Sequence, residues 1–306
     1  QDMFVAPSTD MSSLYGDPLV FFNSGSNSFS RSAINIAGAN WTHGSWAGDI
    51  NGDGFDDIVM SNIGGDNNLV VNYGRADGAF DIFTGKAGVS GGSSVSVADY
   101  LGNGTNTLIL TDAASSLGGN QDVKLYSFVT NAGQVVLNEI STLPVSRFTL
   151  PKHSDALLQA GNDSHTIRNI TFDFNNDGLS DVIVIDNLSG NGVNKSEVQF
   201  LENDGGGTFR DVTDDILIGY DTDIQASYQP VVFDVNGDGL EDIVLSASDT
   251  TNEPPGYHNS TRILMQSSDG KFVQKFETVF SDFYTQIQNM QPNSGNAGQP
   301  VHIVQG

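Results

Sequence analysis

Short apolar runs recur along the whole chain and alternate with polar stretches that are rich in Gly, Asn, Ser and Asp. Runs such as DIVM from Asp57, DVIVI from Asp181 and DIVL from Asp242 are dominated by β-branched residues, which favour strands over helices. The glycine-rich stretches between the runs are typical of tight turns. This pattern predicts an all-β fold with many short strands and no long helices.

The chain also repeats itself, and the most similar segments carry an acidic loop followed by an apolar run. Three copies nearly superimpose, and they read DINGDGFDDIVM from Asp49, DFNNDGLSDVIV from Asp173 and DVNGDGLEDIVL from Asp234. A fourth segment, DYLGNGTNTLIL from Asp99, keeps the length and the apolar run but lacks most of the acidic residues. We interpret the fourth segment as a decayed copy of the same loop.

A second recurring element consists of a β-rich run, a glycine-containing turn and, in most copies, a Phe, which predicts a β-hairpin. The five copies read LVFFNSGSNSF from Leu19, LVVNYGRADGAF from Leu69, VKLYSFVTNAGQV from Val123, VQFLENDGGGTF from Val198 and ILMQSSDGKF from Ile263. With the strands on either side of an acidic loop, each hairpin makes about four strands in roughly 50 to 70 residues, the size of one β-propeller blade. A β-sandwich also has regularly spaced strands, but sandwiches do not normally repeat one ligand-bearing loop at a fixed point of each unit.

The two ends of the chain bear on the number of blades. QDMFVAPS at the start and QPVHIVQG at the end both resemble the strand that follows an acidic loop. If the terminal strands share one blade, the ring has about five blades, and if the chain is a segment of a larger protein, six or seven are expected. We therefore predict a single β-propeller domain over residues 1–306, with four-stranded blades and five recognisable repeats plus a partial one. The stretch 142–164 is expected to be an insertion on one face.

The acidic loops have the chemistry of calcium sites. Alternate residues carry side-chain oxygens that can turn toward one centre, and the Gly at the sixth position allows a sharp turn. A backbone carbonyl at the seventh position and an Asp at the ninth complete the shell. The predicted ligands are Asp49, Asn51, Asp53, the Phe55 carbonyl and Asp57; Asp173, Asn175, Asp177, the Leu179 carbonyl and Asp181; and Asp234, Asn236, Asp238, the Leu240 carbonyl and Asp242.

An EF-hand loop begins in the same way, but it requires a Glu at the twelfth position and helices on both sides. That position holds Met60, Val184 and Leu245 here, and the flanking residues are strand formers. The sequence therefore places each loop between strands.

Two further copies are expected to bind no metal. The segment from Asp99 has Leu101 at the third position and Thr107 at the ninth, so it lacks two of the ligands. The last copy, around QPNSGNAGQPVHIV, has no carboxylate at all. About three Ca²⁺ ions are therefore expected, with a structural role, because a full protein shell leaves little room for a substrate.

These loops resemble the calcium hairpins of the FG-GAP and VCBS repeats, which occur in integrin α-chain propellers and many bacterial surface proteins. The resemblance is close in the three loops and loose over nearly the whole chain. It implies a Ca²⁺ ion between the first two strands of a blade, on the face of the propeller. The chain has no Gly-Ala-Pro, and Asn at the third position is more similar to the bacterial forms than to integrins.

The net charge of the chain limits the classes of partner that it is expected to bind. Lys and Arg number 12 against 37 Asp and Glu, for a formal net charge of -25, which disfavours phosphate backbones and anionic membrane surfaces. We expect no nucleic-acid partner and no membrane insertion, since no apolar run reaches the roughly 18 residues of a membrane span. The absence of Cys excludes disulfides.

Catalytic motifs are not apparent. No G-x-S-x-G elbow occurs, and Gly85 and Lys86 lack the spacing of a phosphate-binding loop. The histidines are scattered without metal-ligand spacing, at His43, His153, His165, His258 and His302. A hydrolase triad and nucleotide binding are therefore not supported.

Aromatic residues offer two candidate ligand contacts. Trp41 and Trp46 precede the first acidic loop and could stack on a sugar ring, or Trp46 could pack between blades as part of the core. Tyr257 and His258, on an expected exposed loop, are a second candidate.

The leading functional hypothesis is a secreted or cell-surface, and thus extracellular, calcium-binding β-propeller that acts as a binding or adhesion module. Its ligand would be a glycan or a protein bound on a propeller face. The alternative is the propeller domain of a carbohydrate-active enzyme such as a polysaccharide lyase, since a few such lyases resemble this architecture.

Overall fold

The computed structural model describes residues 3–5, 19–23, 29–33, 42–62, 68–86, 92–112, 123–145, 164–190, 193–220, 227–247 and 262–275. Within these ranges the protein is all-β, and the only helix there is the four-residue α2 (Thr213–Ile216). No helix in the same ranges is long and apolar enough to cross a membrane. The all-β prediction is confirmed.

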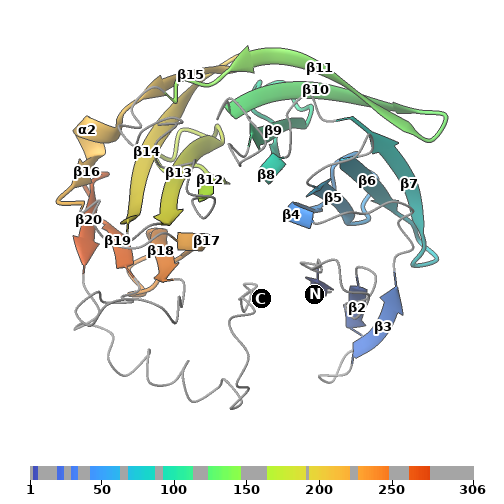
Figure 1. Ribbon diagram of the computed structural model, residues 1–306, viewed down its shortest axis with the longest axis horizontal. Helices are drawn as coiled ribbons and strands as arrows, with labels where there is room; N and C mark the ends of the chain where they lie inside the picture. Colours follow the sequence, from blue (N-terminus) through green and yellow to red (C-terminus); the bar gives the residue numbers. More distant parts are fainter. Residues whose placement is uncertain are drawn as a thin grey trace.

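The strands form four sheets that follow one another along an arc (Figure 1). The first sheet is antiparallel and has three strands, in the order β1-β2-β3. Its strands are β1 (Met3–Val5), β2 (Leu19–Asn23) and β3 (Phe29–Ala33).

The second sheet has eight strands but consists of two antiparallel four-stranded units. The first unit is β4 (Thr42–Gly48), β5 (Asp57–Asn62), β6 (Leu69–Gly74) and β7 (Phe80–Gly85). The second is β8 (Gly92–Ala98), β9 (Thr107–Asp112), β10 (Val123–Asn131) and β11 (Gln134–Thr142). Within the sheet, the two units are joined by the parallel pairing of β7 with β11, with Thr84 opposite Gln134. Each unit is therefore a separate up-and-down meander.

The remaining two sheets repeat the same meander. The third sheet is β12 (Ser164–Phe172), β13 (Asp181–Gly190), β14 (Val193–Gly205) and β15 (Thr208–Asp211). The fourth is β17 (Ser227–Phe233), β18 (Asp242–Ala247), β19 (Arg262–Gln266) and β20 (Phe272–Lys275), with β16 (Leu217–Ile218) added parallel to β20. The five predicted hairpins are all confirmed, as the antiparallel pairs β2–β3, β6–β7, β10–β11, β14–β15 and β19–β20.

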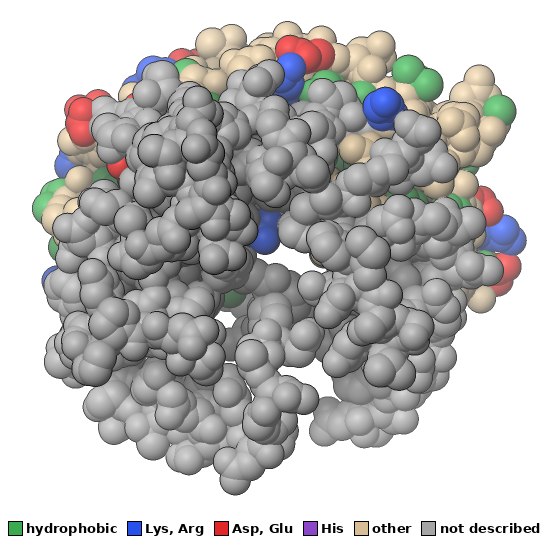
Figure 2. Space-filling view, viewed as in Figure 1, with side chains coloured by type: hydrophobic (Ala, Val, Ile, Leu, Met, Phe, Trp, Pro, Cys, Tyr) green, Lys and Arg blue, Asp and Glu red, His purple; other side chains and the backbone are tan. Residues whose placement is uncertain are grey.

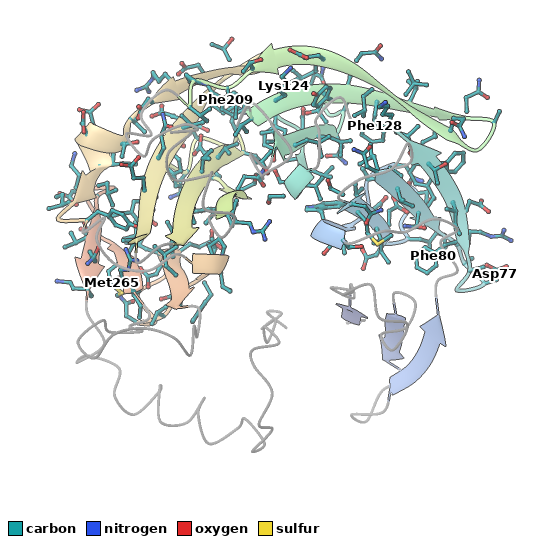
Figure 3. The ribbon with its side chains drawn as sticks, viewed as in Figure 1. Asp77, Phe80, Lys124, Phe128, Phe209 and Met265 are labelled. Atoms are coloured by element: carbon teal, nitrogen blue, oxygen red, sulfur yellow. The ribbon has the colours of Figure 1, made fainter. Side chains whose placement is uncertain are left out.

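Three hydrophobic clusters lie between successive four-stranded units. Successive residues of a strand point to opposite faces, so Leu108 and Leu110 of β9 pack in the first cluster while Ile109 packs in the second. In the same way Val182 of β13 faces the second cluster and Ile183 the third. The units β8–β11 and β12–β15 are thus apolar on both faces, which explains why the apolar runs of β9 and β13 are continuous rather than alternating. Figure 3 shows side chains from neighbouring sheets filling these spaces.

The first strand of each unit lies innermost on the arc, as β4, β8, β12 and β17 do in Figure 1. Gly44 of β4 shows how closely two of these strands approach, because a Cβ added to it would lie 2.8 Å from the Cα of Ser94 in β8. A side chain at this point would therefore push the two inner strands apart.

Charged side chains of both signs are interspersed along the outer rim of the described part (Figure 2). Two exposed arginines pair with carboxylates of their own hairpins: Arg75 with Asp77 and Asp81, and Arg210 with Glu202 and Asp204. Because such exposed ion pairs contribute only about 0–1 kcal/mol each, the core clusters are the main support of the units.

Candidate metal centres

Four loops occupy the same place in their units, between the first strand and the second. We call residues 49–57 loop 1, residues 99–107 loop 2, residues 173–181 loop 3 and residues 234–242 loop 4. The ninth residue of each loop is the first residue of the second strand, namely Asp57, Thr107, Asp181 and Asp242. The prediction that these loops join strands rather than helices is confirmed.

The Asp at the first position closes the turn of each acidic loop through backbone amides. In loop 1 the Asp49 carboxylate accepts hydrogen bonds from the N–H groups of Gly52, Asp53 and Gly54, at 2.7, 3.1 and 2.9 Å. Equivalent bonds reach Asp173 in loop 3 and Asp234 in loop 4. The sixth residue is Gly in all four loops and has a φ near +80° to +90°, for example +89° at Gly54, where a side chain would be strained.

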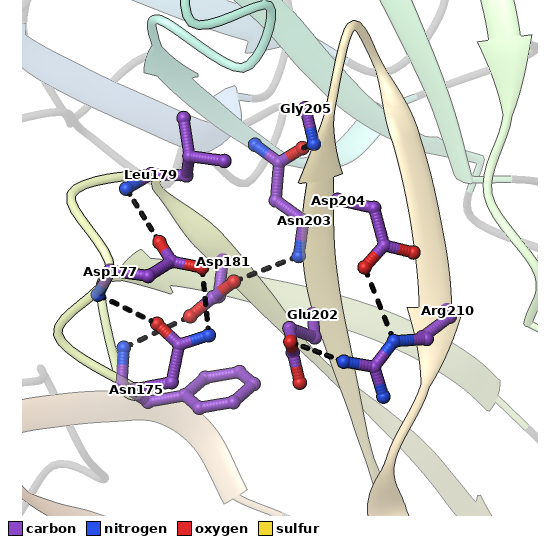
Figure 4. Close-up of polar contacts among 10 residues, drawn as sticks. Asn175, Asp177, Leu179, Asp181, Glu202, Asn203, Asp204, Gly205 and Arg210 are labelled. Atoms are coloured by element: carbon purple, nitrogen blue, oxygen red, sulfur yellow. Dashed lines mark hydrogen bonds and ion pairs between the residues drawn. The ribbon is translucent and has the colours of Figure 1, made fainter.

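The third and fifth positions of each acidic loop contact one another. In loop 3, shown in Figure 4, Asn175 Nδ2 donates to Asp177 Oδ2 at 2.9 Å, and Asp177 Oδ1 accepts from the N–H of Leu179 at 2.8 Å. Loops 1 and 4 have the same pair of contacts. These side chains are exposed, so the oxygens of the third and fifth positions lie on the solvent side of the loop.

The Asp at the ninth position, in contrast, is fully buried in all three acidic loops. One oxygen of Asp181 accepts a hydrogen bond from the N–H of Phe174 at 3.1 Å, and the other accepts from the N–H of Asn203 in the third strand at 2.8 Å. Asp57 and Asp242 make the same two contacts, with third-strand partners Gly74 and Gln266. The ninth carboxylate therefore ties its loop to the third strand of the unit.

Burial destabilises the charged form of these carboxylates and so raises their pKa values. Desolvation raises the pKa of Asp181 to about 7, against opposing backbone hydrogen bonds, and the charges of Asp177 and Asp173 raise it further. Desolvation also raises the pKa of Asp57 and of Asp242. The ion pairs of Arg75, Lys124 and Arg210 are made with carboxylates outside the three acidic loops.

Loop 2 shows which contacts the turn itself needs. Asp99 accepts from the N–H groups of Asn103 at 3.0 Å and Gly104 at 2.6 Å, so the turn forms as in the other loops. Although burial works in the opposite direction, backbone hydrogen bonds from Gly104 and Asn103 lower the pKa of Asp99. At the ninth position Thr107 donates to the carbonyl of Ala98 at 3.2 Å. The acidic residues at the fifth and ninth positions of loops 1, 3 and 4 are therefore not required to form the turn.

The donor set of the acidic loops consists only of oxygen atoms, from carboxylates, an Asn amide and a backbone carbonyl, which is the ligand type that Ca²⁺ prefers. In the described ranges, no three His, Asp or Glu side chains are placed to hold a metal ion by themselves. In its donor types each acidic loop fits a hard cation.

Several polar residues of these units were not predicted from the sequence. Asn203 and Gln266, at the ends of the apolar runs FLEN and LMQ, hold the ninth carboxylates of loops 3 and 4 through their backbone N–H groups. Gly74 does the same in loop 1. A polar residue or Gly that ends the apolar run of a third strand is the only sequence signal for these positions.

The aromatic candidates are only partly described. Trp46 lies on β4, is partly buried and packs against the first hydrophobic cluster, which supports its interpretation as a core residue. Trp41, Tyr257 and His258 lie outside the described residues, as do His153, His302 and the segment QPNSGNAGQPVHIV. The 142–164 insertion is described only at its two ends, and Leu143 and Val145 are buried in the second cluster.

Comparisons with known proteins agree with the repeat pattern. Residues 1–60 and 173–245 match a family model described as FG-GAP-like repeat, and these two segments include loops 1, 3 and 4. A search of curated proteins gave no match.

The solved structures similar to this chain include a rhamnogalacturonan lyase PL11 of Bacillus licheniformis, with 14% sequence identity and a TM-score of 0.40. The alignment covers 84% of this chain and 58% of that one. This chain therefore spans little more than half the length of the lyase structure.

Proposed function

Because this chain carries FG-GAP-like repeats, we propose that it is a calcium-stabilised β-propeller that works as a binding module. The support for a propeller is the series of four-stranded meanders, each with its first strand innermost and its hairpin outermost along one arc (Figure 1). Each meander then corresponds to one blade of a single propeller domain.

One observation carries the calcium proposal. Three loops repeat the same contacts and the same fully buried ninth Asp, whereas loop 2 forms the same turn without the acidic residues. In each acidic loop the first, third, fifth and ninth side chains and the seventh carbonyl would hold the ion. When bound, Ca²⁺ supplies positive charge that offsets the carboxylates and links the loop to the strand that follows it.

Calcium titration tests this proposal. Isothermal calorimetry of the metal-stripped protein should show about three ions bound per chain. The triple variant Asp53→Ala, Asp177→Ala, Asp238→Ala, which removes the fifth-position carboxylate of each acidic loop, should lose this binding. The matched control is Asn103→Ala, at the fifth position of loop 2, which should leave the stoichiometry unchanged. Binding that persists in the triple variant, or that is absent from the unmodified protein, would contradict the proposal.

We further propose that the chain is secreted or displayed at a cell surface and that a propeller face binds a glycan or a protein. The resemblance of the loops to repeats of integrin α-chains and bacterial surface proteins supports this location and role. Calcium would act by holding the loops of that face in one conformation, so that less conformational entropy is lost when a partner binds.

A glycan array with and without EDTA tests the binding role. Hits that disappear in EDTA would support a calcium-dependent glycan ligand, and silence across the array together with calcium-dependent capture of a defined surface protein would support a protein ligand. Release of unsaturated products from acidic polysaccharides would overturn the assignment as a binding module alone.

A further inference from the structure

Neighbouring loops are joined by a side-chain amide that crosses from one four-stranded unit to the next. The carbonyl of Phe174, the second residue of loop 3, accepts a hydrogen bond from Gln266 Nε2 at 2.7 Å. Gln266 ends the third strand, β19, of the next unit and is only 6% exposed. The amide is thus a buried contact between loop 3 and the unit that carries loop 4.

The backbone of Gln266 extends this contact to loop 4. Its N–H donates to Asp242 Oδ1 at 2.8 Å, while the N–H of Phe174 donates to Asp181 Oδ2 at 3.1 Å. Three hydrogen bonds therefore connect the ninth carboxylate of loop 4 to the ninth carboxylate of loop 3. All four residues are buried, so water does not compete for these hydrogen bonds. In the low-dielectric interior, a hydrogen bond is also stronger than in water.

Two other amides make the same crossing, but neither connects two acidic loops. Asn203 Nδ2 donates to the Tyr100 carbonyl at 3.1 Å, in loop 2, which has no ninth carboxylate. Asn106 Nδ2 donates to the Ile50 carbonyl at 2.9 Å, and Asn106 itself belongs to loop 2. Among the described residues, Gln266 is thus the amide that links two complete acidic loops.

On the basis of the calcium sites proposed above, we propose that Gln266 is a positioning residue that couples calcium binding at loop 3 to calcium binding at loop 4. When loop 4 is loaded, Asp242 has one orientation and fixes the N–H of Gln266. The Gln266 amide then holds the carbonyl of Phe174, and the N–H of the same residue holds Asp181 in its binding orientation for loop 3. Less conformational entropy is then lost when loop 3 binds its own ion, so calcium in loop 4 raises the calcium affinity of loop 3. By thermodynamic linkage, calcium in loop 3 raises the affinity of loop 4 by the same factor.

The coupling can be measured in proteins that lack the calcium site of loop 1. Asp53→Ala inactivates loop 1 and leaves loops 3 and 4 intact. Adding Asp238→Ala leaves only loop 3, and adding Asp177→Ala leaves only loop 4. Calcium titration against a chromophoric chelator then gives each single-site affinity and the two-site isotherm. We expect the second ion to bind about 5-fold or more tightly than the single-site proteins predict, the lower end of typical allosteric coupling.

Gln266→Met tests the assigned residue, because it keeps the length and backbone N–H of Gln266 but removes the amide. In this variant the affinity for the second ion should lie within about twofold of the value expected for independent sites, which is below the usual range of allosteric effects. The matched control is Asn106→Leu, which removes the crossing from loop 2 to the Ile50 carbonyl of loop 1 and should leave coupling between loops 3 and 4 intact. A merely structural role of Gln266 would lower stability without changing the ratio of affinities.

Each outcome decides one of the two proposals. Coupling that survives Gln266→Met, or that is missing from the Asp53→Ala protein although both sites bind, overturns the role of Gln266. Failure of the Asp53→Ala protein to bind any calcium overturns the calcium sites instead.

If Gln266→Met does not fold, hydrogen exchange gives the answer without a change at Gln266. In the protein that can load only loop 4, calcium should slow exchange at the Phe174 amide of loop 3. An unchanged exchange rate in that protein, measured with calcium bound, overturns the role of Gln266.

Discussion

At the scale of single residues, the ninth Asp of each acidic loop combines two properties that rarely occur together. Its carboxylate is fully buried, yet its described hydrogen-bond donors are backbone amides rather than cationic side chains. A buried carboxylate in such surroundings is held either as the neutral acid or by a cation. At the proposed calcium sites, we therefore propose Asp57, Asp181 and Asp242 as the residues where protons and calcium compete.

This competition predicts a pH dependence of the metal-free protein. The folded protein binds the Asp181 proton up to about pH 7, whereas the unfolded chain releases it near pH 3.8, so folding takes up a proton between these values. The stability from this group is fully present below pH 3.8 and is lost as the pH rises through about 7, by at most about 4 kcal/mol. Denaturant unfolding in EDTA at several pH values measures the loss.

Asp181→Asn is the control for that measurement, because the amide stays neutral at all pH values. The difference in unfolding free energy between the two proteins should change with pH in EDTA. The contributions of the other acidic groups cancel in that difference, because they are the same in both proteins. If the two proteins keep a constant difference from pH 4 to pH 8, the assignment of the proton to Asp181 is wrong.

At the scale of elements, the four-stranded meander is the repeated unit, and neighbouring meanders share their hydrophobic clusters. The units β8–β11 and β12–β15 present apolar residues on both faces, and their two faces belong to different clusters. Third-cluster rings such as Phe174, Phe200 and Phe272 come from two different units and contact one another edge-on or tilted. A core substitution should therefore loosen two units together.

Phe200→Ala tests this packing. Phe200 is fully buried between β14 and the neighbouring unit, so its removal should cost about 3–5 kcal/mol of unfolding free energy. Val129→Ala, on the outer hairpin where Val129 is 56% exposed, should change stability by less than about 0.5 kcal/mol. Denaturant titration of both variants gives the comparison, and equal losses would contradict the assigned core.

At the scale of the whole molecule, the units are arranged in series, and the units β4–β7 and β8–β11 touch one another at three levels. Inner strands approach closely at Gly44 and Ser94, apolar clusters fill the middle, and β7 and β11 pair at the outer edge. The loop amides add a polar contact on top of these. Neighbouring four-stranded units are therefore held together by both apolar and polar contacts.

Gly44→Ala should disturb the arc from its inner side. The new Cβ would lie 2.8 Å from the Cα of Ser94 and 2.9 Å from Val95 N, both backbone atoms that cannot turn away. Overpacking of this kind costs about 1–3 kcal/mol, which thermal unfolding can detect. Ser45→Ala, at the next and exposed position of β4, is the control and should be close to neutral. Similar melting temperatures for both variants would contradict the close approach.

The sequence by itself determined the strands, the five hairpins and the position of each loop between strands. These features rest on local physics: β-branched runs, turn residues and short-range contacts such as those of Asp49 with the next five residues. Repetition then made each local pattern recognisable several times. The candidate ligands were found in this way because they lie within nine consecutive residues.

Only the tertiary structure decided which residues surround those ligands. Asn203 is 22 residues from Asp181, and Gln266 is 92 residues from the Phe174 carbonyl that it contacts. No spacing rule relates such distant positions, because their contact depends on how one unit packs on the next. The burial of the ninth Asp, the amide crossings between loops and the pairing of β7 with β11 all follow from that packing, which is long-range and therefore invisible to local sequence patterns.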